Sequence, residues 1–455
     1  MKPFEVIWAD LRALVSDTVR VWWRLLPQLL TLQIGGWLGY QITLWIAAAV
    51  STRNGWIALG IFSLGFVFTL GSIVLMLRLV GRELGIRTLI PRSDDESDDG
   101  RDTSISRLLA LTLLPFLGIY AAFNYVSQRA EELNVRSLLQ TGVLGETTLL
   151  GQLNPTSSRR TLVIVICVVA GAYIVRRVLD LLHARTQWQW LGVATATVEA
   201  FFLLVLILSG QRLLYSLRAG LLDREVFSWL DQFVQSMAGF FRLFRIDLPA
   251  VLALVGRFLR DIAWPAVLDV MVEPVAWLAV AALVYGSHVL SLADLWRKGE
   301  PLASQVPIPR RLRRLRDRKV GSTGVRRIAL AFQEAFLGDI DDKYLPTLQS
   351  IRLIIRSGLT FLGAYVLIYT AIRVLNNLID VVSSLLAGGH QVDFWVPYGS
   401  FFDLLGFLPT ESLRICLLAV AFHRCLLLFK ARAADVDTAV LPADVVARAP
   451  AEVRS

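Results

Sequence analysis

The chain has 455 residues, of which 55% are hydrophobic and 18% are charged, and its formal net charge is +9. A soluble protein carries nearer one quarter charged residues, so this composition excludes an ordinary soluble domain and indicates a protein whose solvent is lipid. The cations gather at the ends of apolar runs. We therefore attribute the positive charge to membrane topology and expect no nucleic-acid partner.

The N-terminal segment, residues 1–25, predicts an amphipathic helix that lies in the membrane interface. Apolar side chains such as Ile7, Leu14 and Trp22 fall on one side of a helix, and charged side chains such as Arg12 fall elsewhere. The first long apolar run begins only after this segment. This is not the pattern of a cleavable signal peptide, so we expect the N-terminus to be retained.

Eight apolar runs follow, each able to cross the roughly 30 Å hydrocarbon core of a bilayer as a helix. The predicted fold class is an all-α membrane protein with about eight transmembrane helices and additional interfacial amphipathic helices. The predicted spans cover residues 26–50, 55–77, 105–126, 161–176, 189–210, 265–292, 351–376 and 411–430.

The distribution of Lys and Arg predicts that both termini are cytoplasmic. With the N-terminus inside, the inner segments hold 32 of the 46 Lys and Arg residues, as the positive-inside rule requires. The chain is rich in Arg and Ala and poor in Lys, which is typical of a GC-rich bacterial genome. We therefore expect a multi-pass protein of the bacterial plasma membrane.

Three segments outside the predicted spans have their own character. Residues 211–263 predict an outer helical insert, whose part 227–262 is a candidate surface for a protein partner, although contact with the membrane explains its aromatic content more simply. Residues 432–455 predict a flexible cytoplasmic tail. Residues 297–349 form a basic cytoplasmic loop, where five arginines are candidates for contact with anionic lipid, although topology anchoring alone explains them equally well. These are Arg310, Arg311, Arg313, Arg314 and Arg316.

Two apolar phrases far apart in the chain suggest an internal duplication. Residues 166–173 read ICVVAGAY, and residues 415–422 read ICLLAVAF. Because further matching phrases keep the same order at nearly constant spacing, we predict two tandem four-helix repeats, 26–185 and 186–431. Four is an even number of spans, so the two repeats enter the membrane from the same side and are parallel.

Ionisable side chains within the predicted spans are the candidate functional residues. Each costs about 2.5–3.5 kcal/mol at the centre of a membrane helix and needs a partner or a cavity. Asp269 and Glu273 are four residues apart on one face of the sixth span, and we predict that Arg373 or Arg414 pairs with them. The candidate substrate- or ion-binding residues are Asp269, Glu273, Glu199, Arg373, Asp380 and Arg414. Interhelical ion pairs without a substrate explain the same residues equally well.

One short motif resembles an enzyme signature. Residues 131–136 read EELNVR, which fits the Glu-Glu-x-x-x-Arg pattern of intramembrane CAAX-type proteases. That family also needs histidines in a defined pattern, and none of the four histidines here has it. The three cysteines lack the spacing of a zinc site. We treat the motif as a coincidence and expect no enzymatic activity, no metal and no cofactor.

Two kinds of function fit the sequence. The first is a transporter or lipid-translocation component, in which the outer-leaflet polar cluster binds a charged substrate. The second is a non-catalytic membrane scaffold or assembly subunit of a cell-envelope complex. The sequence does not fix the substrate or the oligomeric state.

Overall fold

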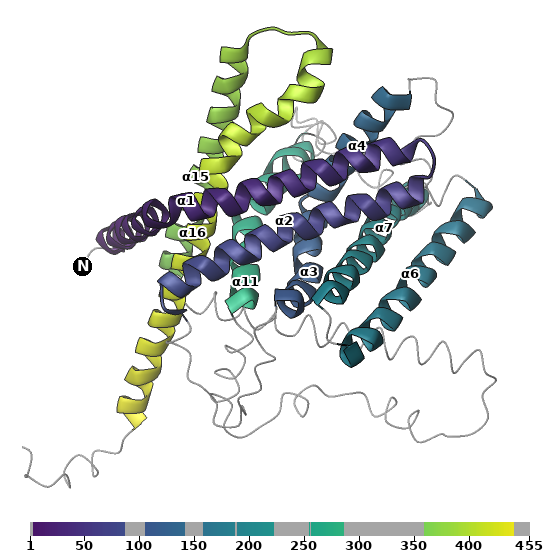
Figure 1. Cartoon of the computed structure of the whole chain (residues 1–455). Helices are drawn as coiled ribbons and strands as arrows, with labels where there is room; N and C mark the ends of the chain where they lie inside the picture. Colours follow the sequence, from purple (N-terminus) through teal and green to yellow (C-terminus); the bar gives the residue numbers. More distant parts are fainter. Residues whose placement is uncertain are drawn as a thin grey trace, which may run out of the picture.

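The structure, a computed structural model, describes residues 3–86, 105–141, 158–186, 189–222, 254, 256–285 and 359–440. Every regular element in these ranges is a helix, as Figure 1 shows. The helices are α1 (Pro3–Ser51), α2 (Gly55–Glu83), α3 (Ile105–Ala122), α4 (Tyr125–Thr141), α6 (Arg159–Thr186), α7 (Gln189–Leu222), η2 (Phe258–Ala263), α10 (Trp264–Val267), η3 (Leu268–Val272), α11 (Glu273–Tyr285), α15 (Leu359–Ala387) and α16 (Val392–Val440).

Six helices in the described part of the chain are long and apolar enough to cross a membrane. They are Gly55–Glu83, Arg159–Leu179, Gly192–Leu213, Phe258–Tyr285, Thr360–Ala387 and Tyr398–Leu428. Each overlaps one predicted span, and together they indicate a helical, multi-pass membrane protein. The remaining predicted spans, 26–50 and 105–126, fall in α1 and α3 and stay predictions as membrane spans.

α1 and α2 form an antiparallel hairpin (Figure 1). Asn54 caps α2, since its side chain accepts hydrogen bonds from two backbone N–H groups of the first turn. Farther along the hairpin, a Cβ on Gly36 would lie 2.5 Å from the Cβ of Ser72. The Ser72 hydroxyl donates to the Leu32 carbonyl at 2.8 Å. Small residues at this contact let the two helix backbones approach closely.

In α1, the predicted interfacial segment 1–25, from Pro3 onward, and the predicted span 26–50 belong to one continuous helix. The chain forms one helix of 49 residues through the predicted boundary at residue 26, about 74 Å long at 1.5 Å per residue. Pro27 lies just after that boundary, and the helix continues through it. The change in hydropathy near residue 26 therefore does not coincide with a break in the helix.

The predicted sixth span and the end of the outer insert also form one helical stretch, Phe258–Tyr285. Two parts of it, η2 and η3, are π-helical. Pro265 and Pro274 follow these parts closely, and a proline lacks the backbone N–H that an α-helix needs. The prolines therefore explain why the regular hydrogen-bond ladder is interrupted at these two places.

α15 and α16 form a second hairpin, which turns at Gly388, where φ is +82° and glycine is favoured. Asp17 of α1 accepts a hydrogen bond from Arg424 of α16 at 2.5 Å, so these parts of the two helices lie side by side. α16 continues to Val440, so the predicted tail 432–455 begins as helix.

Several predictions lie outside the described residues. They concern the basic loop 297–349 with its five candidate arginines, most of the outer insert 211–263, and the tail beyond residue 440. The division into two parallel repeats also stays a prediction.

Candidate functional site

Glu273 lies at the point where the π-helical η3 passes into α11, and its side chain is only 2% exposed. Arg373 Nη1 donates to its Oε2 at 2.5 Å. The hydroxyls of Tyr125 and Tyr369 donate to its Oε1 at 2.9 and 3.2 Å. A buried carboxylate stays charged only with such donors around it. We call these four side chains the Glu273 cluster.

The helix break before Glu273 also supplies a backbone acceptor. The N–H of Glu273 bonds to the carbonyl of Leu268, five residues back, and the next residue, Pro274, has no N–H. Neither residue therefore donates to the carbonyl of Asp269. Arg373 Nη1 points at this carbonyl oxygen at 3.5 Å. The π-helical turn thus frees an acceptor next to the arginine that holds Glu273.

Arg414 on α16 lies beside the Glu273 cluster but does not contact the Glu273 carboxylate. Its Nη1 donates to the Tyr369 hydroxyl at 3.0 Å, and its Nη2 donates to Glu411, three residues earlier, at 2.5 Å. Its guanidinium carbon lies 4.3 Å from the centre of the Trp277 ring, a cation–π geometry. Arg414 is therefore linked to the cluster through Tyr369.

The other candidates from the sequence lie elsewhere. Asp269 is exposed, and Arg373 hydrogen-bonds to its backbone carbonyl rather than to its carboxylate. Glu199 on α7 pairs with Arg176 of α6 at 3.4 Å. Asp380 on α15 accepts a hydrogen bond from Asn376 at 2.8 Å. Only half of the six candidates therefore meet at one place.

Sequence reasoning missed the tyrosines of this site. Tyr369 precedes Arg373 by four residues on α15, and this spacing places the two side chains on one face. The pairing of Tyr369 with Arg373 was therefore predictable from their spacing in the sequence. Tyr125 comes from α4, and no local pattern connects it with α11 or α15. Its hydrogen bond to Glu273 depends on how three helices pack.

A stripe of polar side chains continues from Tyr125 along α4. Tyr125, Arg129, Glu132 and Arg136 are spaced by four, three and four residues and share one face, which we call the α4 stripe. Glu132 accepts hydrogen bonds from Arg136 at 3.0 Å and from the Tyr40 hydroxyl of α1 at 3.1 Å. Arg129 lies over the Tyr40 ring at 4.3 Å. The EELNVR motif therefore brings its Glu132 and Arg136 into contact.

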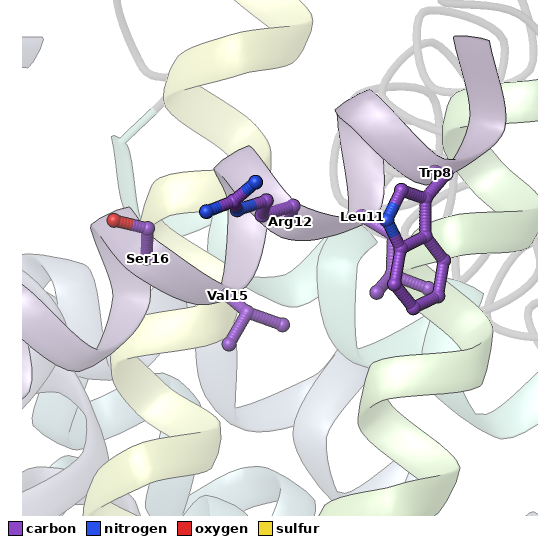
Figure 2. A pocket seen from close by; sticks show the side chains of 5 residues that line it. All are labelled: Trp8, Leu11, Arg12, Val15 and Ser16. Atoms are coloured by element: carbon purple, nitrogen blue, oxygen red, sulfur yellow. The ribbon is translucent and has the colours of Figure 1, made fainter. Parts of the chain in front are cut away.

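Two grooves in the described part of the chain lie away from Glu273. The first, of about 400 Å³, is lined by five labelled side chains of α1, as Figure 2 shows: Trp8, Leu11, Arg12, Val15 and Ser16. The second, of about 420 Å³, lies between α1, α4 and α16 and includes Arg136. The second groove thus adjoins the far end of the α4 stripe.

Within the described residues, no group of three or more His, Cys, Asp and Glu side chains is placed to hold a metal ion. Comparison with known proteins finds no matching protein family, no matching curated sequence and no matching solved structure.

Proposed function

We propose that this protein is a non-catalytic transporter or lipid-translocation component that handles a charged amphiphile through the Glu273 cluster. The observation that carries the proposal is the buried ion pair of Glu273 and Arg373 beside a π-helical interruption of an apolar helix. Ionisable groups inside membrane helices are costly and typically mark substrate or ion pathways. π-helical turns are likewise frequent at functional sites.

The two members of the pair differ in accessibility, which gives the cluster a way to exchange partners. The side chain of Glu273 is 2% exposed, whereas that of Arg373 is 39% exposed. An anionic headgroup that approaches from the exposed side meets Arg373 first. The hydroxyls of Tyr125 and Tyr369 keep Glu273 hydrogen-bonded while Arg373 turns to the incoming group.

The membrane setting of the proposal is a bacterial plasma membrane with both termini cytoplasmic. The Lys and Arg distribution supports this orientation. The contact between Asp17 and Arg424 supports placing the beginning of α1 and the end of α16 on one side of the membrane.

The second candidate function is a scaffold or assembly subunit, and a different observation favours it. The Glu273 carboxylate already accepts three hydrogen bonds from side chains, so the cluster is complete as a structural ion pair. In that case the protein would act through a protein partner, with residues 227–262 as the candidate surface.

Lipid translocation in proteoliposomes tests the first proposal. The purified chain is reconstituted with phosphatidylglycerol that carries a fluorescent NBD headgroup, and dithionite bleaches the label in the outer leaflet only. Translocation by the protein brings inner-leaflet label out and deepens the bleaching. Glu273→Gln removes the charge that positions Arg373, so we expect bleaching to fall to that of protein-free vesicles.

The control is Glu83→Gln, which makes the same chemical change in an exposed pair with Arg24, remote from the cluster. It should translocate like the wild type. Tyr125→Phe and Tyr369→Phe keep their rings and remove one hydrogen bond each, so they test the cluster if Glu273→Gln does not fold. If the wild type bleaches no further than protein-free vesicles, the scaffold function is favoured. If folded Glu273→Gln translocates like the wild type, the Glu273 cluster does not carry the translocation.

A further inference from the structure

We propose that the groove between α1, α4 and α16 is a binding site for a phospholipid with an anionic headgroup, whose phosphate is held by Arg136. Its lining residues are Trp37, Gln41, Ile42, Trp45, Ile46, Arg136, Ser400 and Phe401. We call it the Arg136 groove. The proposal goes beyond the translocation function and does not depend on it.

One wall of the Arg136 groove has the chemistry of an acyl-chain contact. Its α1 residues are spaced as one side of a helix and are mainly aromatic or branched aliphatic. Ile42 is 57% exposed and Trp45 is 64% exposed. Trp37 packs edge-on against Phe401 of α16 at 5.6 Å between ring centres. This packing holds the wall in place on two helices at once.

The other end of the groove is polar and positively charged. Arg136 donates to Glu132 at 3.0 Å and to the Ser400 hydroxyl at 2.8 Å, and its side chain is 19% exposed. These two contacts fix the guanidinium in the groove lining. Gln41 lies in the same lining. A guanidinium held beside a hydroxyl and an amide suits a phosphate group, which accepts several charge-assisted hydrogen bonds.

The charged side chains of the α4 stripe are arranged around Glu132. Glu132 is shared between two arginines, since it lies 3.0 Å from Arg136 and 3.9 Å from Arg129. Asp403 of α16 also lies near this stripe, with electrostatic contacts to Arg129 and Glu132. Two carboxylates and two guanidinium groups therefore meet here, and Arg136 is the guanidinium that lines the groove.

The apolar wall and the arginine together favour a lipid over a free anion as the ligand of the Arg136 groove. A soluble phosphate could use Arg136 and Ser400 but would leave the exposed wall of Trp45 and Ile42 without a partner. A diacyl phospholipid covers the wall with hydrocarbon and brings a fixed negative charge to the guanidinium. The tryptophans are also of the residue type that gathers at the headgroup level of membranes.

Native mass spectrometry of the detergent-solubilised full chain tests this proposal. Dioleoyl phosphatidylglycerol and dioleoyl phosphatidylcholine are titrated separately, and glycerol phosphate serves as the soluble probe. The wild type should bind phosphatidylglycerol at least about tenfold more tightly than phosphatidylcholine, as expected for one charge-assisted contact. It should show no glycerol phosphate adduct at the same concentration.

Two variants separate the two ends of the site. Arg136→Gln should abolish the preference for phosphatidylglycerol, whereas Arg20→Gln, on a side chain 76% exposed far from the groove, should keep it. Trp45→Ala changes an exposed side chain and should weaken both lipids by a similar factor. Glu273→Gln should bind phosphatidylglycerol like the wild type, so a failure of translocation and a failure of this site are told apart.

Three outcomes would overturn the proposal. Equal wild-type affinity for the two lipids would mean unspecific lipid contact. A glycerol phosphate adduct as strong as that of the lipid would mean a site for a soluble anion. An unchanged preference in Arg136→Gln would place the headgroup elsewhere, and if that variant does not fold, an unchanged affinity in Trp45→Ala is equally decisive.

Discussion

The two similar apolar phrases of this chain, 166–173 and 415–422, differ in how deeply they are buried. In α6, the phrase at 166–173 begins with Ile166, which is 57% exposed. In α16, the phrase at 415–422 is buried from end to end, and Ile415 is 0% exposed. α6 packs mainly against α7, whereas α16 packs against α1, α2, α11 and α15.

This difference shows what apolar sequence can and cannot report in a membrane protein. In water, an exposed Ile is a local cost, so apolar periodicity indicates which face is buried. In lipid, the solvent is itself apolar, and a side chain gains little hydrophobic free energy by moving from lipid into protein. The same phrase can therefore face lipid in one helix and protein in another.

The largest expected effect comes from shortening the matched isoleucines. Ile415→Ala opens a cavity in a fully buried contact and should lower the free energy of unfolding by about 2–5 kcal/mol. Ile166→Ala exchanges one lipid contact for another and should cost less than about 1 kcal/mol. Unfolding by SDS in mixed micelles measures both. Equal losses would show that α6 is covered by protein after all.

A smaller effect of the same kind is expected from enlarging the matched cysteines. Cys416 is buried and Cys167 is exposed. Cys416→Leu overpacks its surroundings and should cost about 1–3 kcal/mol, while Cys167→Leu should leave stability nearly unchanged. The same SDS unfolding experiment gives both values. If both substitutions were neutral, the close packing of α16 described here would be wrong.

The smallest perturbation is a spin label attached to the native Cys167, which requires no substitution. Since the other two cysteines, Cys416 and Cys425, are buried, a nitroxide reagent should label Cys167 selectively in the purified protein. In liposomes, the label should collide readily with oxygen and rarely with a polar nickel chelate, which is the pattern of a lipid-facing site. Low accessibility to both would instead indicate a protein partner on α6.

Much of the helical fold was predictable, because long apolar runs and prolines are local signals. Each of the six helices able to span a membrane overlaps an apolar run of the sequence. The continuity of α1 was not predictable from hydropathy, because the pattern changes near Pro27 while the backbone does not. Hydropathy therefore predicts which segments lie in the membrane, but it does not predict where a helix begins or ends.

The candidate site was predictable only in part, for a related reason. Glu273 was a candidate because it lies four residues after Asp269 on one helix face, which is a local pattern. Arg373 was a candidate because a buried carboxylate needs a cation. Whether Arg373 or Arg414 contacts Glu273 depends on the packing of α15 and α16, and the contribution of Tyr125 depends on α4. The EELNVR motif fits an enzyme pattern only by coincidence of residue types, and its contact between Glu132 and Arg136 is visible only once α4 is placed against α1 and α16.

The ion pairs near the beginning of α1 have a mechanical consequence. Arg24 pairs with Glu83, where α2 ends, and Asp17 pairs with Arg424, near the end of the apolar part of α16. Together they clamp α1 at one level of the bundle. About 20 Å of helix precedes Asp17. Leu14, just before Asp17, is fully buried, so the core holds α1 there as well, and a tilt of the hairpin of α1 and α2 would carry the first turns of the helix with it.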